Sequence, residues 1–372
     1  MKVGVDARAA IWYRGTGIGT YTYQLIRNLH GLKDKIVKFR CFWPGDEYRD
    51  LEITREEVFD SIEQYKDKFW EEVHIPQRLE NEGIDLYHVP QNGIGLPGKQ
   101  KCPTIVTIHD LIPYVYPETV GKGYLKIFLE QMPRIVEEAD KIITVSKWSQ
   151  RDLEKILKVP AEKITITYEA PEPIYRPLPK GETQKVLREK YGLTKDYILY
   201  IGGFGPRKNV KGLINAYNEV YKDINDDVKL VFVGKQAKDF TELTMLIEAL
   251  GLEERVIWTG FAPVQDLPYL YNGARVFVYP SFYEGFGLPP LEAMACGTTT
   301  ITSNVSSIPE VVGKSALLVN PYNTVELAEA LYRLLNNPQL AAEYGQKGLR
   351  RAKMFTWEKT AKETMKVYQS FM

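Results

Sequence analysis

The sequence has few of the residues that build metal centres or disulfide frameworks. Its 372 residues include 4 histidines and 3 cysteines. Cys41, Cys102 and Cys296 lie far apart along the chain, and none belongs to a C-x-x-C pair. Neither a zinc site nor a disulfide framework is therefore indicated, and we expect three buried free thiols.

Two further absences limit where the protein acts and what it binds. No apolar run approaches the ~18 residues that a membrane-spanning helix needs, and the start of the sequence has no signal-peptide pattern. Lys+Arg and Asp+Glu balance at 48 each, so no overall basic field favours a nucleic-acid partner. We therefore expect a cytoplasmic protein that binds no nucleic acid.

Short apolar runs alternate with amphipathic stretches over almost the whole chain. This pattern predicts an α/β fold with parallel sheets. In the first half we expect strands over residues 2–6, 37–43, 85–89, 104–109, 141–145 and 164–168. Helices are expected there over 18–30, 124–138 and 147–157, with a loop and one short helix within 45–70.

The alternation restarts after residues 169–180, where four prolines exclude a regular helix or central strand and indicate an interdomain linker. Strands are then expected over 197–201, 229–233, 256–259, 276–279, 299–302 and 316–319. Helices are expected over 209–221, 238–250, 290–296, 324–335, 338–355 and 356–372. The chain length suits two domains, 1–173 and 182–355, which predicts a ligand site in a cleft between two sheets.

The first candidate for a binding site is a glycine-rich loop that follows the first strand and opens a helix. Gly15, Gly17 and Gly19 let backbone amides approach a ligand closely, and the helix start adds positive potential. The G-x-G-x-G spacing is not the dinucleotide fingerprint. The loop is therefore interpreted either as a phosphate cradle or as a flexible turn.

Two more candidates lie at the ends of expected strands. His109 and Asp110 end an apolar strand, where α/β proteins collect functional groups, although Asp110 is also suited to capping the next turn. Arg207 and Lys208 lie in a glycine-containing turn between a strand and a helix. Two adjacent cations match what a diphosphate requires, and the alternative is a solvated basic turn.

The segment with the most specific pattern holds two carboxylates, Glu284 and Glu292, in an E-x7-E arrangement. Gly285 and Gly287 can present amides to an anion, and Pro290 suits the first turn of a helix. Glu292 would then be placed to accept hydrogen bonds from vicinal hydroxyls. Paired acids also occur in glycoside hydrolases, but the phosphate-friendly loop favours a sugar nucleotide over a plain glycan.

Together and in this order, these segments resemble the family 4 retaining glycosyltransferases, from Gly4 to about Trp357. The resemblance implies the GT-B fold, with two Rossmann-like parallel-sheet domains facing an interdomain cleft and helix 356–372 crossing back onto the first domain. It also implies a hexosyltransferase that takes a nucleotide-diphosphate sugar and needs no cofactor or metal. The sequence accordingly contains no Asp-x-Asp pair.

The resemblance further implies a role for each site residue. Glu292 would bind the donor ribose, and Glu284 would hold the transferred hexose. Arg207 and Lys208 would neutralise the diphosphate, and His109 would sit beside the donor sugar. The remaining donor-binding residues implied are Gly17, Ile18 and Gly19 at the phosphates, Gly285, Phe286, Gly287 and Leu288 at the hexose, and Phe261 near the base.

Two departures from the pattern bear on the donor. Gly203 stands where many relatives carry arginine, so Arg207 is expected to supply that charge. Ser306 and Ser307 stand where relatives often have two glycines, which resembles a bacterial mannosyltransferase branch. This favours GDP-mannose, with UDP-glucose or another UDP-sugar as the alternative.

The acceptor is less well indicated than the donor. Residues 121–134 mix aromatic, apolar and basic side chains. They suit either a lipid-linked acceptor at the inner face of a membrane, with peripheral contact, or an ordinary core-packed helix. Two other functions stay open: a nicotinamide oxidoreductase, for which the fingerprint is missing, and a catalytically silent sugar-nucleotide sensor.

Overall fold

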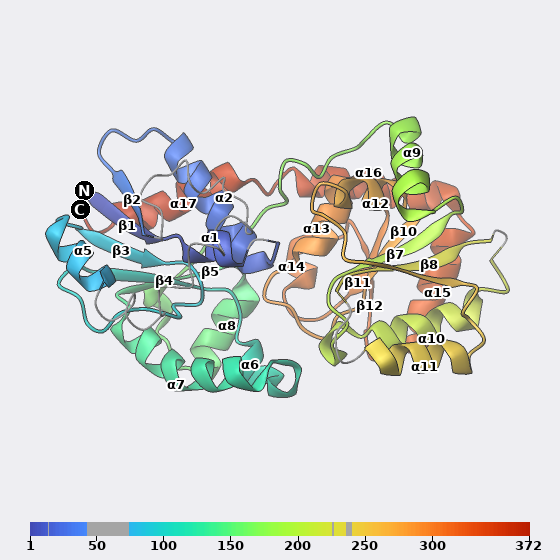
Figure 1. Cartoon of the computed structure of the whole chain (residues 1–372), viewed down its shortest axis with the longest axis horizontal. Helices are drawn as coiled ribbons and strands as arrows, with labels where there is room; N and C mark the ends of the chain where they lie inside the picture. Colours follow the sequence, from blue (N-terminus) through green and yellow to red (C-terminus); the bar gives the residue numbers. More distant parts are fainter. Residues whose placement is uncertain (14, 43–73, 225–226, 236–239) are drawn as a thin grey trace. The chain divides into compact units, whose positions relative to one another are not determined.

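The computed structural model describes residues 1–13, 15–42, 74–224, 227–235 and 240–372, with Trp12 described by its backbone only. The loop and short helix expected within 45–70 lie outside these residues. The chain divides into two compact units, Met1–Glu169 with Thr356–Met372, and Ala170–Phe355 (Figure 1).

The first unit is built on a six-stranded sheet in the order β2-β1-β3-β4-β5-β6. All of its neighbouring strands are parallel. The strands are β1 (Lys2–Asp6), β2 (Lys38–Phe42), β3 (Leu86–Val89), β4 (Thr104–Ile108), β5 (Lys141–Thr144) and β6 (Ile164–Ile166). Every strand expected in this half is confirmed to within two residues at each end, because each is a short apolar run or, in β2, a run in which apolar residues alternate with Lys38 and Arg40.

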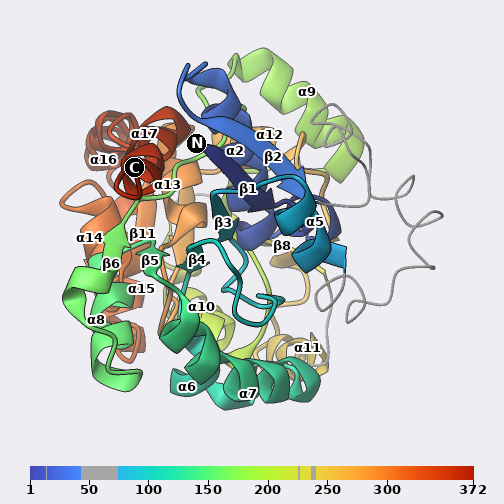
Figure 2. The same ribbon diagram turned by 90° about the vertical axis from the view of Figure 1, so that its left-hand side faces the viewer.

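Helices cover both faces of this sheet, with α2 and α17 on one face and α7 on the other (Figures 1 and 2). Their bounds are α1 (Arg8–Trp12), α2 (Gly17–Gly31), α5 (Ile75–Asn81), α6 (Ile112–Val115), α7 (Lys122–Glu138), α8 (Lys147–Ile156) and α17 (Trp357–Gln369). The sequence did not predict α1, α5 or α6, which are too short to show a helical period.

Helix α17 belongs to the first unit although it follows the whole second unit in the sequence. Thr356 caps it by accepting a hydrogen bond from the amide of Lys359. Tyr368 is fully buried, and its hydroxyl lies 2.7 Å from Nδ1 of His88 on β3. Because α17 buries its apolar face against α2, its C-terminal end is anchored in the core of the first unit.

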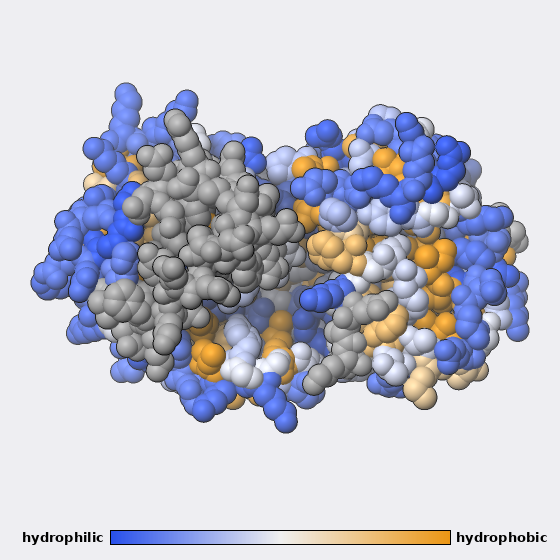
Figure 3. Space-filling view, viewed as in Figure 1, coloured by the Kyte–Doolittle hydropathy of each residue, from blue (hydrophilic) through white to orange (hydrophobic). Residues whose placement is uncertain are grey.

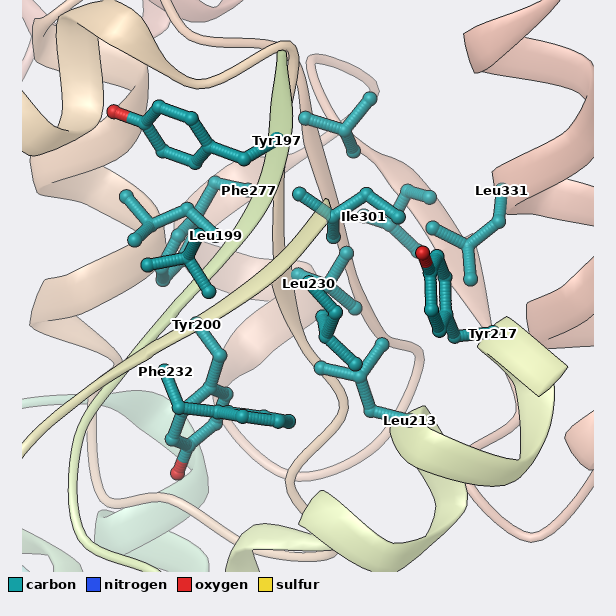
Figure 4. Packing of buried hydrophobic residues seen from close by; sticks show 14 of the residues in the cluster. Tyr197, Leu199, Tyr200, Leu213, Tyr217, Leu230, Phe232, Phe277, Ile301 and Leu331 are labelled. Atoms are coloured by element: carbon teal, nitrogen blue, oxygen red, sulfur yellow. The ribbon is translucent and has the colours of Figure 1, made fainter. Parts of the chain in front are cut away.

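The second unit has a parallel six-stranded sheet in the order β12-β11-β10-β7-β8-β9. The strands are β7 (Tyr197–Ile201), β8 (Lys229–Val233), β9 (Val256–Gly260), β10 (Val276–Tyr279), β11 (Thr300–Ser303) and β12 (Leu317–Val319). In the core, Leu213 and Tyr217 of α10 and Leu331 of α15 pack toward strand residues such as Leu230 and Ile301 (Figure 4).

The helices of the second unit include three that the sequence did not predict: α9, α12 and α14. The bounds are α9 (Lys180–Tyr191), α10 (Val210–Val220), α11 (Phe240–Ala249), α12 (Leu267–Gly273), α13 (Leu288–Ala295), α14 (Ile308–Val312), α15 (Thr324–Leu335) and α16 (Pro338–Ala352). Residues 170–179, expected as a linker, form neither helix nor strand, but Tyr175 packs in the core of this unit.

Candidate functional site

The basic turn after β7 is fixed by the side chain of Asn209. Pro206–Lys208 form one 3-10 turn, and Asn209 has a left-handed backbone with φ +54°. Its side-chain amide donates to the carbonyl oxygens of Pro280, at 3.2 Å, and of Pro321, at 2.8 Å. Because Asn209 has this left-handed backbone, it lies outside the helix, and α10 begins at Val210 and not at Asn209 as expected.

The two cations of this turn meet the first acid of the E-x7-E segment. Oε1 of Glu284 lies 2.7 Å from Nζ of Lys208 and 2.9 Å from a guanidinium nitrogen of Arg207. Lys208 also donates to the hydroxyl of Tyr279, and Arg207 to the carbonyl oxygen of Tyr283. The three charged side chains are only 11–17% exposed, so the turn is not a solvated basic loop.

These contacts keep Glu284 ionised. Burial by itself raises the pKa of this carboxyl group, but the charges of Lys208 and Arg207 outweigh that effect and lower the pKa to about 2. The result is a buried cluster of two positive charges and one negative charge. Its net positive charge suits an anion such as a diphosphate.

The loop that carries Glu284 is held by the two consecutive serines. The amide of Glu284 donates to Oγ of Ser306 at 3.1 Å, and the hydroxyl of Ser307 lies 2.8 Å from the carbonyl oxygens of both Glu284 and Phe286. Gly287 has φ +109°, and a Cβ there would lie 2.5 Å from Ile308, so only glycine fits. Buried hydroxyls and one glycine thus set the path of the loop.

Ser306 keeps a left-handed backbone, with φ +55°, that costs a non-glycine residue about 1 kcal/mol. We therefore expect Ser306→Gly to change the melting temperature little, because the relieved strain offsets the lost hydrogen bond to the amide of Glu284, but to lower kcat about fivefold, since the loop is held less firmly. Lys158→Gly is the matched control, because Lys158 is exposed and has φ +57°. Equal activity of both variants, measured for the sugar transfer that the sequence predicts, would contradict this role of Ser306.

The second acid of the segment, Glu292, lies on α13. Its Oε2 accepts a hydrogen bond from the hydroxyl of Tyr271 at 2.9 Å, and the rings of Tyr271 and Tyr175 meet edge to face at 5.7 Å. The sequence analysis missed both tyrosines, because α12 is too short to predict and Tyr175 lies in the proline-rich segment. Tyr271 orients the carboxylate that was expected to bind a ribose.

The other donor-binding residues expected in this unit lie in different surroundings. Phe261 follows β9 and is 72% exposed, whereas Phe286 is buried and meets the ring of Phe355 at 6.0 Å. Leu288 is half-buried at the start of α13.

The order of the strands explains why the basic turn after β7 contacts Glu284, which follows β10. Strands β7 and β10 are neighbours in the sheet, whereas β9, which precedes Phe261, lies at the sheet edge.

In the first unit, the glycine-rich loop forms the start of α2. Thr16 is the cap residue, and its hydroxyl oxygen accepts from the amide of Gly19 at 3.2 Å. Gly17 and Ile18 are the first two residues of the helix, whose amides have no acceptor within it. The positive end of α2 can therefore attract an anion through these two amides.

His109 is buried after β4, and both of its ring nitrogens have partners. Nδ1 lies 3.0 Å from Oε1 of Glu169, and Nε2 lies 2.9 Å from the carbonyl oxygen of Pro90. Asp110 accepts a hydrogen bond from the amide of Ile112 at 2.9 Å, so it caps the next turn as the alternative interpretation predicted. The sequence analysis placed Glu169 in a linker and did not connect it with His109.

Within the described part of the chain, no group of three or more His, Cys, Asp or Glu side chains is placed to hold a metal ion. The three cysteines are free thiols, with Cys41 and Cys296 buried and Cys102 half-buried. None of the described helices is both long enough and apolar enough to cross a membrane.

Comparison with known proteins assigns the chain to a family. Residues 183–351 match the model described as Glycosyl transferases group 1, and residues 15–170 match Glycosyltransferase Family 4. O-antigen chain mannosyltransferase B of Escherichia coli is 35% identical, over 99% of this chain and 100% of that protein.

Solved structures show the same fold. Sucrose-phosphate synthase from Thermosynechococcus elongatus has a TM-score of 0.78 at 23% identity, covering 100% of this chain and 98% of that chain. HepE of Anabaena, in complex with UDP-glucose, has a TM-score of 0.73 at 18% identity and covers 100% of both chains. The fold is therefore GT-B, and the chain belongs to the glycosyltransferase family of O-antigen chain mannosyltransferase B.

Proposed function

We propose that this glycosyltransferase moves a hexose, with retention of anomeric configuration, from a nucleotide-diphosphate sugar to a glycan or lipid-linked acceptor. The observation that carries the proposal is the buried cluster of Arg207, Lys208 and Glu284. A catalytically silent sugar-nucleotide sensor is the alternative function, and turnover of the donor separates the two.

Each part of the donor has a candidate partner. Arg207 and Lys208 would bind the diphosphate, with support from the amides at the start of α2. The Glu292 carboxylate, oriented by Tyr271, would accept from the ribose hydroxyls, and the amides of the loop after Glu284 would hold the hexose. The side chain of Phe261 is exposed, so it is available to contact the nucleotide base of the donor.

We favour GDP-mannose as the donor. Ser306 and Ser307 hold the Glu284 loop with their hydroxyls, so they are part of this site and not neutral replacements for glycine. The 35% identical relative is named as a mannosyltransferase, which supports the same sugar. The complex of HepE with UDP-glucose shares only the fold with this chain, so UDP-glucose remains the second candidate.

We propose front-face attack as the mechanism. In this scheme a departing diphosphate oxygen accepts the proton of the acceptor hydroxyl, while Arg207 and Lys208 stabilise the growing negative charge. The rival mechanism makes Glu284 a nucleophile, and a trapped glycosyl-enzyme would establish it. A carboxylate whose pKa is about 2, and which is bound to two cations, is a weak nucleophile, which supports the first scheme.

The surface of α6 and α7 supports a lipid-linked acceptor. Phe128 packs in the core of the first unit, so the helix is core-packed on one side. Val115, Tyr124, Ile127 and Leu129 are each 38–44% exposed, and Figure 3 shows apolar residues at this surface. The proposal includes peripheral membrane contact through these residues.

A thermal-stability panel tests the donor proposal. We expect GDP-mannose at 100 times its Kd to add about 2.7 kcal/mol of apparent stability, with smaller effects from UDP-glucose and none from NAD. The panel is run with EDTA present, because no metal ion is proposed. The donor that raises the thermal stability of the protein is then incubated with the protein and either an oligosaccharide or a lipid-linked glycan in vesicles, to identify the acceptor. A shift from NAD alone would overturn the proposal, and binding without transfer to any acceptor would favour the sensor.

A further inference from the structure

The contact between His109 and Glu169 gives information that membership of the family does not: the charge of His109 and a positioning role for Glu169. We propose that Glu169 is a positioning residue that holds His109 as a buried imidazolium cation. The link to transfer rests on the proposed function, but the charge of His109 is measurable without it.

The hydrogen-bond partners determine where the protons lie. The carbonyl oxygen of Pro90 can only accept, so Nε2 of His109 must carry a hydrogen. A Glu169 carboxylate also only accepts, so Nδ1 must carry the other hydrogen. A ring that donates from both nitrogens is an imidazolium. It has no free lone pair, so it cannot act as a general base.

Electrostatics agrees with this assignment. Burial by itself lowers the pKa of His109, but the hydrogen bond and charge of Glu169 raise it above the ordinary value, with smaller contributions from Pro90 and Asp110. His88 shows the opposite behaviour nearby: burial and the charge of His109 lower its pKa to about 3.

Another titratable group packed on the ring of His109 is Tyr21 of α2, whose ring meets the imidazole edge to face at 4.6 Å. Burial raises the pKa of Tyr21 to about 12, and the charge of Glu169 adds to this, so the phenol stays neutral. Glu169 and Asp110 are therefore the anions that face His109 among the described residues, and only Glu169 bonds directly to the ring.

Glu169 also lies where the chain leaves the first unit. Ala170 is the first residue of the second unit, and the chain returns at Thr356. The hydroxyl of Thr360, just after this return, donates to the carbonyl oxygen of Tyr168 at 2.6 Å, and Trp357 meets the ring of Tyr21 at 5.9 Å. Residues next to both crossings of the chain therefore contact the immediate neighbours of the His109–Glu169 pair.

Histidine ring ¹⁵N NMR of the full chain tests the charge directly. In the wild type at pH 7.5 we expect both ring nitrogens of His109 to be protonated while His88 is neutral, with His109→Gln assigning the signal. Glu169→Gln keeps the size and a hydrogen-bond partner but removes the charge, so His109 should become neutral at the same pH. A neutral His109 in the wild type would overturn the proposal.

The pH profile of transfer tests the positioning role. Without the charge of Glu169, burial should lower the pKa of His109, so kcat/KM of Glu169→Gln should fall by about tenfold or more at pH 8 and recover as the pH is lowered. Glu169→Asp keeps the charge and should retain the wild-type profile. Thr360→Val should lower the melting temperature without changing the profile, because it removes only the hydrogen bonds of this hydroxyl to the carbonyl oxygens of Tyr168 and Thr356. If Glu169→Gln shows the wild-type profile with a neutral His109, the positioning role is wrong. If no variant or wild type transfers sugar, the proposed function fails while the NMR result stands.

Discussion

Replacing Lys208 with alanine is expected to lower kcat by about 10²–10³, the usual cost of removing one donor that stabilises developing charge. Nζ of Lys208 lies 2.7 Å from Glu284 and belongs to the cluster proposed to receive the diphosphate. Because that charge is largest in the transition state, kcat should fall more than the affinity for the donor. Steady-state kinetics at saturating donor measures the effect.

Lys211→Ala is the matched control for this experiment. Lys211 follows one turn later, is exposed, and pairs with Glu242 on the surface at 3.0 Å. Its removal should leave kcat unchanged, since exposed ion pairs contribute little. If Lys208→Ala retains activity within a few-fold of the wild type, Lys208 does not stabilise the leaving group.

Glu284→Gln is expected to lower stability in a pH-dependent way. The pKa of Glu284 is lowered in the folded protein from 4.5 to about 2, after burial has been outweighed by Lys208 and Arg207. A lowered pKa contributes stability above the unfolded value, and the contribution is lost as the pH falls through the folded value. At neutral pH the variant should lose about 3 kcal/mol, and below pH 4.5 the deficit should shrink toward pH 2.

The melting temperature of both proteins between pH 7 and pH 3 checks this expectation. Glu242→Gln serves as the control, because Glu242 is exposed and its ion pair with Lys211 lies at the surface. Its melting temperature should follow the wild type at every pH. A deficit of Glu284→Gln that stays constant over the whole range would mean that packing, and not charge, determines the loss.

Most of the fold could be predicted because its signals are local. An apolar run of about five residues between polar stretches indicates a buried strand, and the strands of both sheets were located in this way except β2, where apolar residues alternate with Lys38 and Arg40. Helices α1, α5, α6, α12 and α14 were missed because a stretch of four to seven residues shows no helical period. Helix α9 was missed for another reason: its sequence is largely polar and follows closely on the prolines.

The candidate site was predictable as a set of residues but not as a set of contacts. Glycines, adjacent cations and the E-x7-E spacing identify side chains whose chemistry suits a sugar nucleotide. The sequence alone did not show that Glu284 bonds to Lys208, 76 positions away, or that Tyr271 orients Glu292. Those pairs depend on which strands are neighbours in the sheet.

By itself, then, the sequence determined the α/β class, the strands and the chemical character of the loops that follow them, because each is encoded within a few consecutive residues. Only the tertiary structure decided which loops meet. The order β10-β7 in the second sheet brings the basic turn to Glu284. In the first unit, His109 and Glu169 are 60 positions apart and join after the ends of different strands. A charged side chain acquires its protonation state and its role from such distant neighbours, and strand order, which local patterns do not encode, selects them.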